Sequence, residues 1–250
     1  MTLPEGADVA SREEMLARAN TPEARAMAEA LKGFLDLCDT EEIAPSAGLA
    51  TSTLEFISEP DGNKVLIRFI RPVADEPLPC VYYIHGGGMQ AMSCFDGNYR
   101  AWGRIIAARG VAVAMVDFRN ALTPSSAPEV APYPAGLNDC VAGLKWLAGQ
   151  AQSLGIDGSR IIVAGEKGGG NLTLATGMRL KRERRAAPDQ GHLRPVPLGH
   201  RRYLAAARKP IVHREQRPAA RPAQQQRRHG LRYCRTGEAQ PAGMAGICDG

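Results

Sequence analysis

Two glycine-rich segments, each following an apolar run, are the parts of this sequence best suited to chemistry. The first reads His85-Gly86-Gly87-Gly88 and comes directly after the apolar stretch 79–84. Three glycines at the end of a strand let backbone N–H groups approach a ligand closely, and such groups can stabilise the oxyanion that develops during acyl transfer. An ordinary flexible turn is the alternative interpretation of the glycines alone.

The second segment reads Gly165-Glu166-Lys167-Gly168-Gly169 and follows the apolar run 161–164. A strand, a sharp turn and a helix together form the setting in which the formula G-x-S-x-G presents a nucleophilic serine. Here the central residue is Lys167 in place of serine. The glycines therefore fit the turn, whereas the residue at its tip does not supply the hydroxyl.

The residues around these segments predict the elements that must position them. Near-continuous apolar runs predict buried strands at 79–84, 111–117 and 159–164, and helices are predicted at 98–109, 135–150 and 169–182. Strands that alternate with helices are typical of βαβ units in a parallel sheet.

Two further elements are predicted upstream of the parallel part. Alternating apolar residues at 51–59 and 64–71, on either side of the turn 61–63, predict an antiparallel hairpin at the entrance of the sheet. Thr21-Pro22-Glu23 has the residue types of a helix N-terminus, and the helix should continue to Leu35.

The two glycine-rich segments, taken with Asp117-Phe118-Arg119 between them, resemble the hormone-sensitive-lipase-like branch of the α/β-hydrolase carboxylesterases. That branch is similar in its HGGG loop, in a turn of the type G-[DE]-S-[AG]-G and in an intervening D-[YF]-R segment. The similarity covers residues from about 20 to 183. Beyond about residue 184 we recognise no motif of the family.

The resemblance implies a role for each motif residue. The oxyanion donors would be the backbone N–H groups of Gly86, Gly87 and Gly168, and the nucleophile position would be residue 167. The remaining motif residues are His85, Gly88, Gly165, Glu166 and Gly169. The implied activity is hydrolysis of small carboxylic esters, without a metal and without a cofactor.

The family also places an acid and a histidine on later loops, and this sequence has no such pair in a recognisable motif. We therefore predict that the chain is catalytically inactive or severely impaired. Lys167 could attack an ester once and stop at a stable amide, or form a Schiff base with a carbonyl compound. The alternatives are a residual ester hydrolase, a non-catalytic protein that binds a small ester or carbonyl compound, and a nucleic-acid binder.

The last of these alternatives depends on a change of composition near residue 184. Residues 1–181 carry a net charge of −5, whereas residues 182–250 carry +10 and contain 14 Arg but one Lys. Few apolar residues are left to form a core, so we expect 185–250 to be disordered. The segment is read either as an out-of-frame translation of GC-rich DNA or as an evolved basic arm. Its scarcity of lysine and aromatic residues favours the former, so we do not expect nucleic acid as a partner.

These patterns predict an α/β fold with three parts: an N-terminal helical cap segment (1–40), a partial α/β-hydrolase domain (41–184) and the basic tail (185–250). The expected sheet is mostly parallel and incomplete, and its last strand should have an unpaired edge. Six scattered cysteines, no secretory leader and no membrane-length apolar run favour a reducing cytoplasm. The oligomeric state is not indicated.

Overall fold

The structure is a computed structural model, and it describes residues 11–186. The predicted tail therefore lies outside the described residues from residue 187 onward. Two helices come first, α1 (Arg12–Ala19) and α2 (Pro22–Asp36). The side chain of Thr21 accepts a hydrogen bond from the N–H of Ala24, and Pro22 occupies the first turn, as the sequence predicts.

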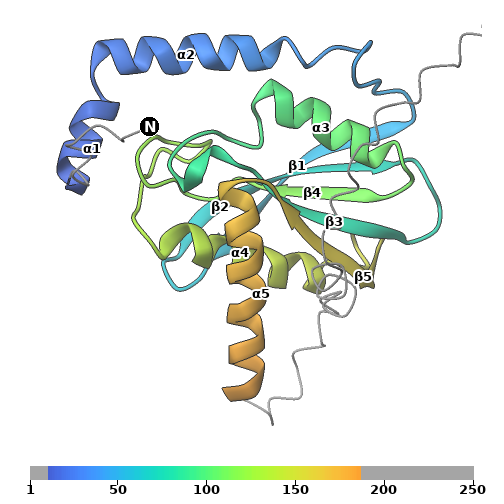
Figure 1. Cartoon of the computed structure of the whole chain (residues 1–250). Helices are drawn as coiled ribbons and strands as arrows, with labels where there is room; N and C mark the ends of the chain where they lie inside the picture. Colours follow the sequence, from blue (N-terminus) through green and yellow to red (C-terminus); the bar gives the residue numbers. More distant parts are fainter. Residues whose placement is uncertain (1–10, 187–250) are drawn as a thin grey trace, which may run out of the picture. The chain divides into compact units, whose positions relative to one another are not determined.

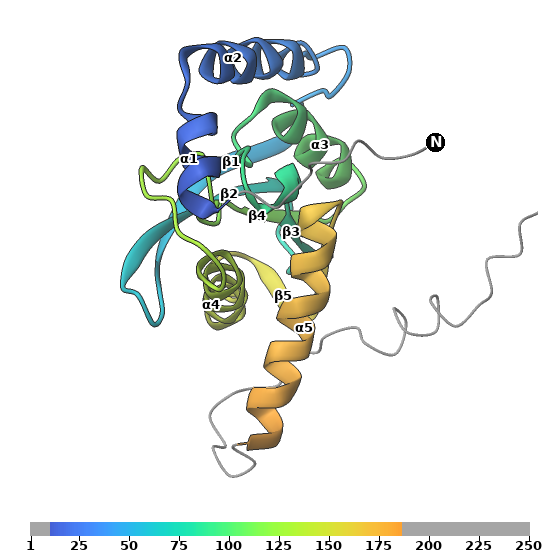
Figure 2. The ribbon, with the colours of Figure 1, turned by 60° about the vertical axis from the view of Figure 1, so that its left-hand side comes forward.

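Helix α2 is anchored to the rest of the fold by its C-terminal end. Its neighbour is α3 (Gly97–Ala107), whose first residue contacts the last residue of α2 (Figure 2). The Asp36 carboxylate accepts the N–H of Gly97 at 2.8 Å, and the guanidinium of Arg100 donates to Asp39 at 2.6 Å. Apolar side chains on α2 stay exposed, for example Met27 and Phe34 at 72% and 67%. Polar contacts at its end therefore hold this helix, with no buried apolar side chain of its own.

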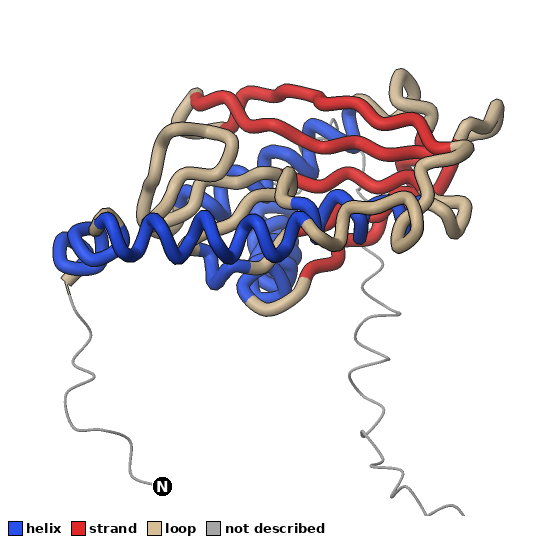
Figure 3. Tube along the Cα trace, turned by 90° about the horizontal axis from the view of Figure 1, so that it is seen from above, coloured by secondary structure: helices blue, strands red, loops and turns tan. Residues whose placement is uncertain are grey.

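Within residues 11–186, five strands form one sheet, in which they lie side by side (Figure 3). They are β1 (Leu49–Ser58), β2 (Asn63–Pro72), β3 (Leu78–Ile84), β4 (Ala112–Val116) and β5 (Ile156–Gly165). Their order is β1-β2-β4-β3-β5, and only β2 runs against the other four. The predicted mostly parallel sheet with an entry hairpin is confirmed, with Gly62 at φ +74° in the hairpin turn.

Helices cover both faces of the sheet, with α3 on one face and α4 (Ala135–Gly149) and α5 (Gly168–Ala186) on the other (Figure 1). Successive side chains of a strand point to opposite faces, so Tyr82 packs on the α4 side and Tyr83 on the α3 side. This two-sided burial explains the near-continuous apolar runs of β3 and β4.

The outer edge of β5 pairs with no strand among residues 11–186, which confirms the expected unpaired edge for the described part. Apolar side chains lie exposed beside it: Ile162 on the strand is 52% exposed, and Leu174 and Met178 on α5 are 60% and 67% exposed. Such an edge offers free backbone groups to any chain that approaches it. Within the described residues, no helix has both the length and the apolar character needed to cross a bilayer.

Candidate active site

The strand order brings the three sequence motifs to one end of the sheet. Strand β3 lies between β4 and β5, and Ile84 is aligned with Val116 on one side and with Gly165 on the other. Each motif begins at or just after this row of residues, so the glycine loop (residues 86–88) lies beside the turn at 165–169. In open α/β sheets, ligands bind outside the carboxyl ends of the strands, at the point where the strand order reverses.

The turn between β5 and α5 has the geometry of a nucleophile elbow. Lys167 adopts φ +51°, and its carbonyl accepts the N–H of Asn171 at 3.2 Å at the start of α5. The left-handed backbone at a non-glycine residue is strained, which is the conformation expected of a residue at the tip of this turn. Its side chain is exposed.

Two glycines make the turn possible by close backbone approach. A Cβ on Gly165 would lie 2.6 Å from the carbonyl carbon of Gly169 and 2.7 Å from the carbonyl oxygen of Ile84. A Cβ on Gly168 would lie 2.8 Å from the Cα of Gly88. The turn is therefore packed directly against the backbone of the glycine loop.

The glycine loop itself is folded in a left-handed conformation that suits glycine. Gly87 and Gly88 have φ angles of +83° and +65°, and the φ angle of Met89 is also positive, at +63°. The segment Gly87–Met89 is therefore a tight turn whose backbone is not that of a regular helix. The loop therefore turns back toward α5 at once after leaving β3.

The backbone N–H groups of the predicted donors differ in their availability. The N–H of Gly86 donates to the hydroxyl of Tyr99 at 2.9 Å. Among the described residues, the N–H groups of Gly87 and Gly168 have no hydrogen-bond acceptor. These two groups are therefore free to bind a ligand oxygen, whereas that of Gly86 is engaged.

Tyr99 also joins the glycine loop to the turn, because its hydroxyl donates to Glu166 at 2.6 Å. Burial raises the pKa of Tyr99, and the hydrogen bond to the Glu166 carboxylate raises it further, so the phenol stays protonated as a donor. Tyr99 is not among the site residues that the sequence predicts. It lies on α3, and no local pattern indicates that this helix brings it to the end of β3.

His85 is completely buried beneath the loop. Its ring stacks on Phe118 with the centroids 4.3 Å apart, and its Nδ1 lies 3.1 Å from the carbonyl oxygen of Gly86. Its Nε2 makes no hydrogen bond and lies 3.7 Å from an Asp117 oxygen. His85 therefore supports the glycine loop from below.

Acid should destabilise the fold through this histidine. Burial lowers the pKa of His85, although Asp117, the Gly86 carbonyl and Glu166 act in the opposite direction. The unfolded chain then binds the extra proton more readily, so stability falls as pH drops below about 6.5, by up to roughly 1.4 kcal/mol per pH unit. Urea denaturation at pH 7.5, 6.5 and 5.5 measures this slope. The His85→Asn variant should flatten it, and an equal slope in both proteins would contradict the assignment.

Asp117 is a brace for two loops. It accepts hydrogen bonds from the hydroxyl of Ser93 at 2.7 Å, from the N–H of Cys94 at 2.9 Å and from the N–H of Ser126 at 2.7 Å. The Ser126 hydroxyl donates to it as well. With these donors the buried carboxylate is satisfied by structural contacts.

Arg119, two residues later, belongs to a separate network. It donates from Nε and Nη2 to the two oxygens of Asp139 at 2.9 Å each, and from Nη2 to Asp61 at 2.7 Å. Asp139 also accepts the hydroxyl of Ser58 at 2.6 Å. This network ties α4 and the entry hairpin to the segment that follows β4.

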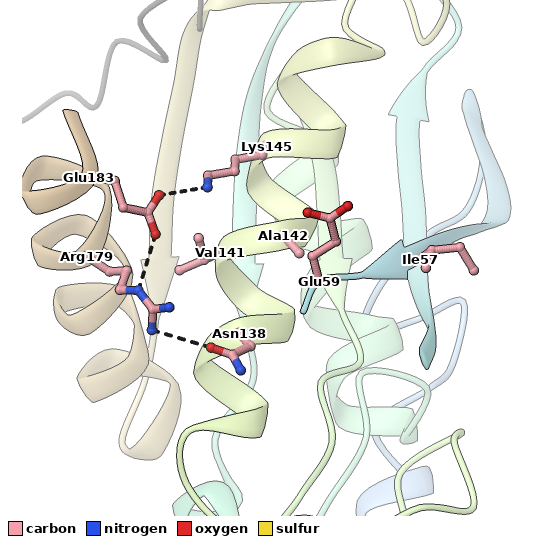
Figure 4. Close-up of a pocket in the computed structure, with 8 residues that line it drawn as sticks. All are labelled: Ile57, Glu59, Asn138, Val141, Ala142, Lys145, Arg179 and Glu183. Atoms are coloured by element: carbon pink, nitrogen blue, oxygen red, sulfur yellow. Dashed lines mark hydrogen bonds and ion pairs between the residues drawn. The ribbon is translucent and has the colours of Figure 1, made fainter. Parts of the chain in front are cut away.

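A cavity of about 210 Å³ lies away from these motifs, between β1, α4 and α5. Glu183 forms an ion pair across it with Lys145 at 2.7 Å. Arg179, which pairs with Glu183 within α5 at 3.2 Å, donates to Asn138 on α4 at 3.4 Å (Figure 4). The contacts with Lys145 and Asn138 join the C-terminal half of α5 to α4. None of the glycine-loop or turn residues lines the cavity.

Known proteins are similar to this chain in sequence and in fold. A family model described as the alpha/beta hydrolase fold matches residues 81–228, so the similarity extends beyond residue 184, where the recognisable motifs end. The carboxylesterase NlhH of Mycobacterium tuberculosis is 40% identical over 102 residues, which cover 41% of this chain and 30% of NlhH. An ethyl acetate hydrolase of Pseudomonas putida is 29% identical, over 62% of this chain and 46% of its own length.

Solved structures are similar over a larger part of the chain. The esterase Est22 is 68% identical with a TM-score of 0.70, over 71% of this chain and 52% of its own. A bacterial brefeldin A esterase is 32% identical with a TM-score of 0.59, over 73% of this chain and 48% of its own. The chain thus spans about half the length of these structures, and less than half of the curated relatives. By the family match, which covers more than half of its residues, the chain belongs to the alpha/beta hydrolase fold family, among its esterase-like and lipase-like members.

Proposed function

We propose that this chain is a degenerate carboxylesterase: its glycine loop accepts the carbonyl group of a small ester, but the ester is not turned over. One observation carries the proposal. Lys167 occupies the strained tip of the turn, at φ +51°, where the family's pattern has serine. The unengaged N–H groups of Gly87 and Gly168 support the binding half of the proposal.

The loss of serine has a large kinetic consequence. Acyl transfer needs a hydroxyl, a base that takes its proton, a group that orients the base and an oxyanion hole. In serine triads, removal of the serine alone costs on the order of 10⁶ in kcat, or roughly 8 kcal/mol of barrier. The retained oxyanion donors do not compensate for that loss, because they stabilise a charge that forms only after attack.

The described residues also do not provide the base. His85 is the only histidine between residues 11 and 186. Its position beneath the glycine loop, fully buried and stacked on Phe118, keeps it from the exposed tip of the turn. The other four histidines lie outside the described residues.

Steady-state hydrolysis should therefore be absent. With p-nitrophenyl butyrate in excess, the wild-type chain is expected to release nitrophenolate, at steady state, no faster than buffer without protein. Lys181→Ser, which replaces an exposed lysine on the same helix, α5, is the matched control for the serine variant that follows. The measurement is absorbance over many equivalents of substrate.

The variant Lys167→Ser completes the test by restoring the hydroxyl. We expect only slow hydrolysis from it, because no histidine among residues 11–186 lies beside residue 167. Sustained hydrolysis by the wild type, blocked by an active-site phosphonate, would refute the proposal. Rapid turnover by Lys167→Ser would refute the absence of a base.

We further propose that the protein works in a reducing compartment, the cytoplasm being the expected one. Its four cysteines within the described range, Cys38, Cys80, Cys94 and Cys140, are all free thiols. Three of them are buried in the core. Disulfides persist chiefly in oxidising compartments, so free thiols support this assignment.

A further inference from the structure

We propose that Lys167 is an acyl-accepting residue, whose amine takes the acyl group from an activated carboxylic ester once per chain. The substrate class is an ester with a good leaving group, either an aryl ester or a thioester. The inference rests on the proposed function, because the same glycine loop must hold the carbonyl group. It adds a covalent step: the site does not turn esters over, but its lysine becomes acylated.

The position of Lys167 presents its amine without a competing partner. The side chain is exposed at the tip of the turn. In the described part of the chain, it forms no ion pair. The neighbouring carboxylate of Glu166 is instead engaged by the hydroxyl of Tyr99 at 2.6 Å. The carboxylate next in sequence is therefore occupied by a contact with α3 and forms no ion pair with the lysine.

The backbone around Lys167 can stabilise the intermediate that such an attack creates. The N–H of Gly168, the next residue, is unengaged within the described residues, and so is the N–H of Gly87 in the loop. The two segments are in contact, because a Cβ on Gly168 would lie 2.8 Å from the Cα of Gly88. A nucleophile beside two backbone donors is the arrangement that acyl transfer requires.

The reaction proceeds in two balanced steps. The lone pair of the neutral Lys167 amine forms a C–N bond to the carbonyl carbon, and the carbonyl π electrons move to the oxygen, where Gly87 and Gly168 donate to it. The C=O bond then re-forms, the C–O or C–S bond breaks, and the leaving group departs with its electron pair. The proton of the attacking nitrogen passes to water. The product is a neutral amide, so the chain reacts once and stops.

Two features of this chemistry restrict the substrate. No acid in the described site protonates a leaving group, which excludes alkyl esters with poor leaving groups. Only the neutral amine has a lone pair to donate, so acylation becomes faster as the pH rises.

The test compares lysines within one protein sample. The full chain is incubated with one to five equivalents of p-nitrophenyl butyrate at pH 8 and pH 9, and peptide mapping by mass spectrometry measures butyryl on each lysine. Lys181 on the same helix and Lys64 on β2, which is 70% exposed, are the internal references. We expect Lys167 to be labelled at least roughly tenfold faster than either, since one oxyanion donor contributes about 10²–10³ in rate. The preference should disappear in guanidinium chloride.

A glycine variant separates the proposed site from mere exposure. Gly87→Ala places a Cβ on backbone at φ +83°, which side chains rarely adopt, and 3.0 Å from Cγ of Met92, so the glycine loop should shift and labelling of Lys167 should fall to that of Lys181. Gly149→Ala is the control, because no atom lies within 4 Å of its Cβ. Should Gly87→Ala fail to fold, the comparison of native and denatured wild-type protein still decides.

The possible outcomes separate this inference from the proposed function. Equal labelling of Lys167, Lys64 and Lys181 in the native protein would overturn the acylation and leave the absence of turnover intact. Nitrophenolate release that continues well beyond one equivalent would overturn the absence of turnover. The peptide map of that same sample then still decides whether Lys167 carries the acyl group.

Discussion

Gly169→Ala is expected to destabilise the fold by about 3–5 kcal/mol, near the upper end for a single substitution. The new methyl group would collide with the carbonyl oxygen of Ile84, and would lie 2.5 Å from that of His85 and 2.7 Å from the carbonyl carbon of Ile84. These are backbone atoms of β3 and its exit, which no side-chain rotation can move. Relief requires α5 or β3 to shift, and either shift separates the turn from the glycine loop.

The matched control for this prediction is Gly33→Ala, inside α2. No atom lies within 4 Å of a Cβ on Gly33. Alanine in a helix interior should therefore stabilise the protein by up to roughly 0.5–1 kcal/mol through its better helix propensity. Urea denaturation of both variants measures the contrast. A Gly169→Ala protein as stable as wild type would show that the backbone of the turn is packed differently.

Asp139→Ala is expected to lower the free energy of unfolding by about 3–5 kcal/mol for a different reason: it leaves a buried charge without its partner. Asp139 is fully buried and binds Arg119 with both of its oxygens. Without this carboxylate, the guanidinium keeps only Asp61, and the hydroxyl of Ser58 loses its acceptor. The desolvation of Arg119 is then no longer offset.

Asp61→Ala provides the comparison, because Asp61 pairs with the same arginine at 2.7 Å but has a side chain that is 39% exposed. A pair of this exposure contributes less than about 1 kcal/mol. Both variants remove a carboxylate that binds the same arginine. The difference between their free energies of unfolding in urea therefore measures the effect of burying the carboxylate. Equal losses would show that Arg119 does not depend on Asp139.

Most elements could be predicted from the sequence, and the errors at their ends have physical causes. The strand predicted at 159–164 begins earlier, at Ile156, because Asp157-Gly158 has the composition of a turn yet continues the strand. The helix predicted at 169–182 runs to Ala186. Its charged last turns show no apolar periodicity and are instead held by the ion pair between Glu183 and Lys145.

The site could be predicted only in part. Parallel strands bring their carboxyl ends together, so the meeting of the glycine loop with the turn follows from the pattern of strands and helices. The strand order does not follow from that pattern, and neither does the role of Tyr99, which depends on how α3 packs. Asp117 and Arg119 lie two residues apart in one sequence motif, yet each belongs to its own network.

The position of β3 between β4 and β5 has a consequence for the order of folding. The β1–β2 hairpin closes over a few residues, but Ile84 meets Gly165 only after some eighty intervening residues have been arranged, and closing so long a loop is slow. The proposed ester site is therefore expected to form late in folding, after the hairpin. A compound that binds this site binds the folded chain and not the unfolded chain. It therefore stabilises the folded state and should act as a pharmacological chaperone for this chain.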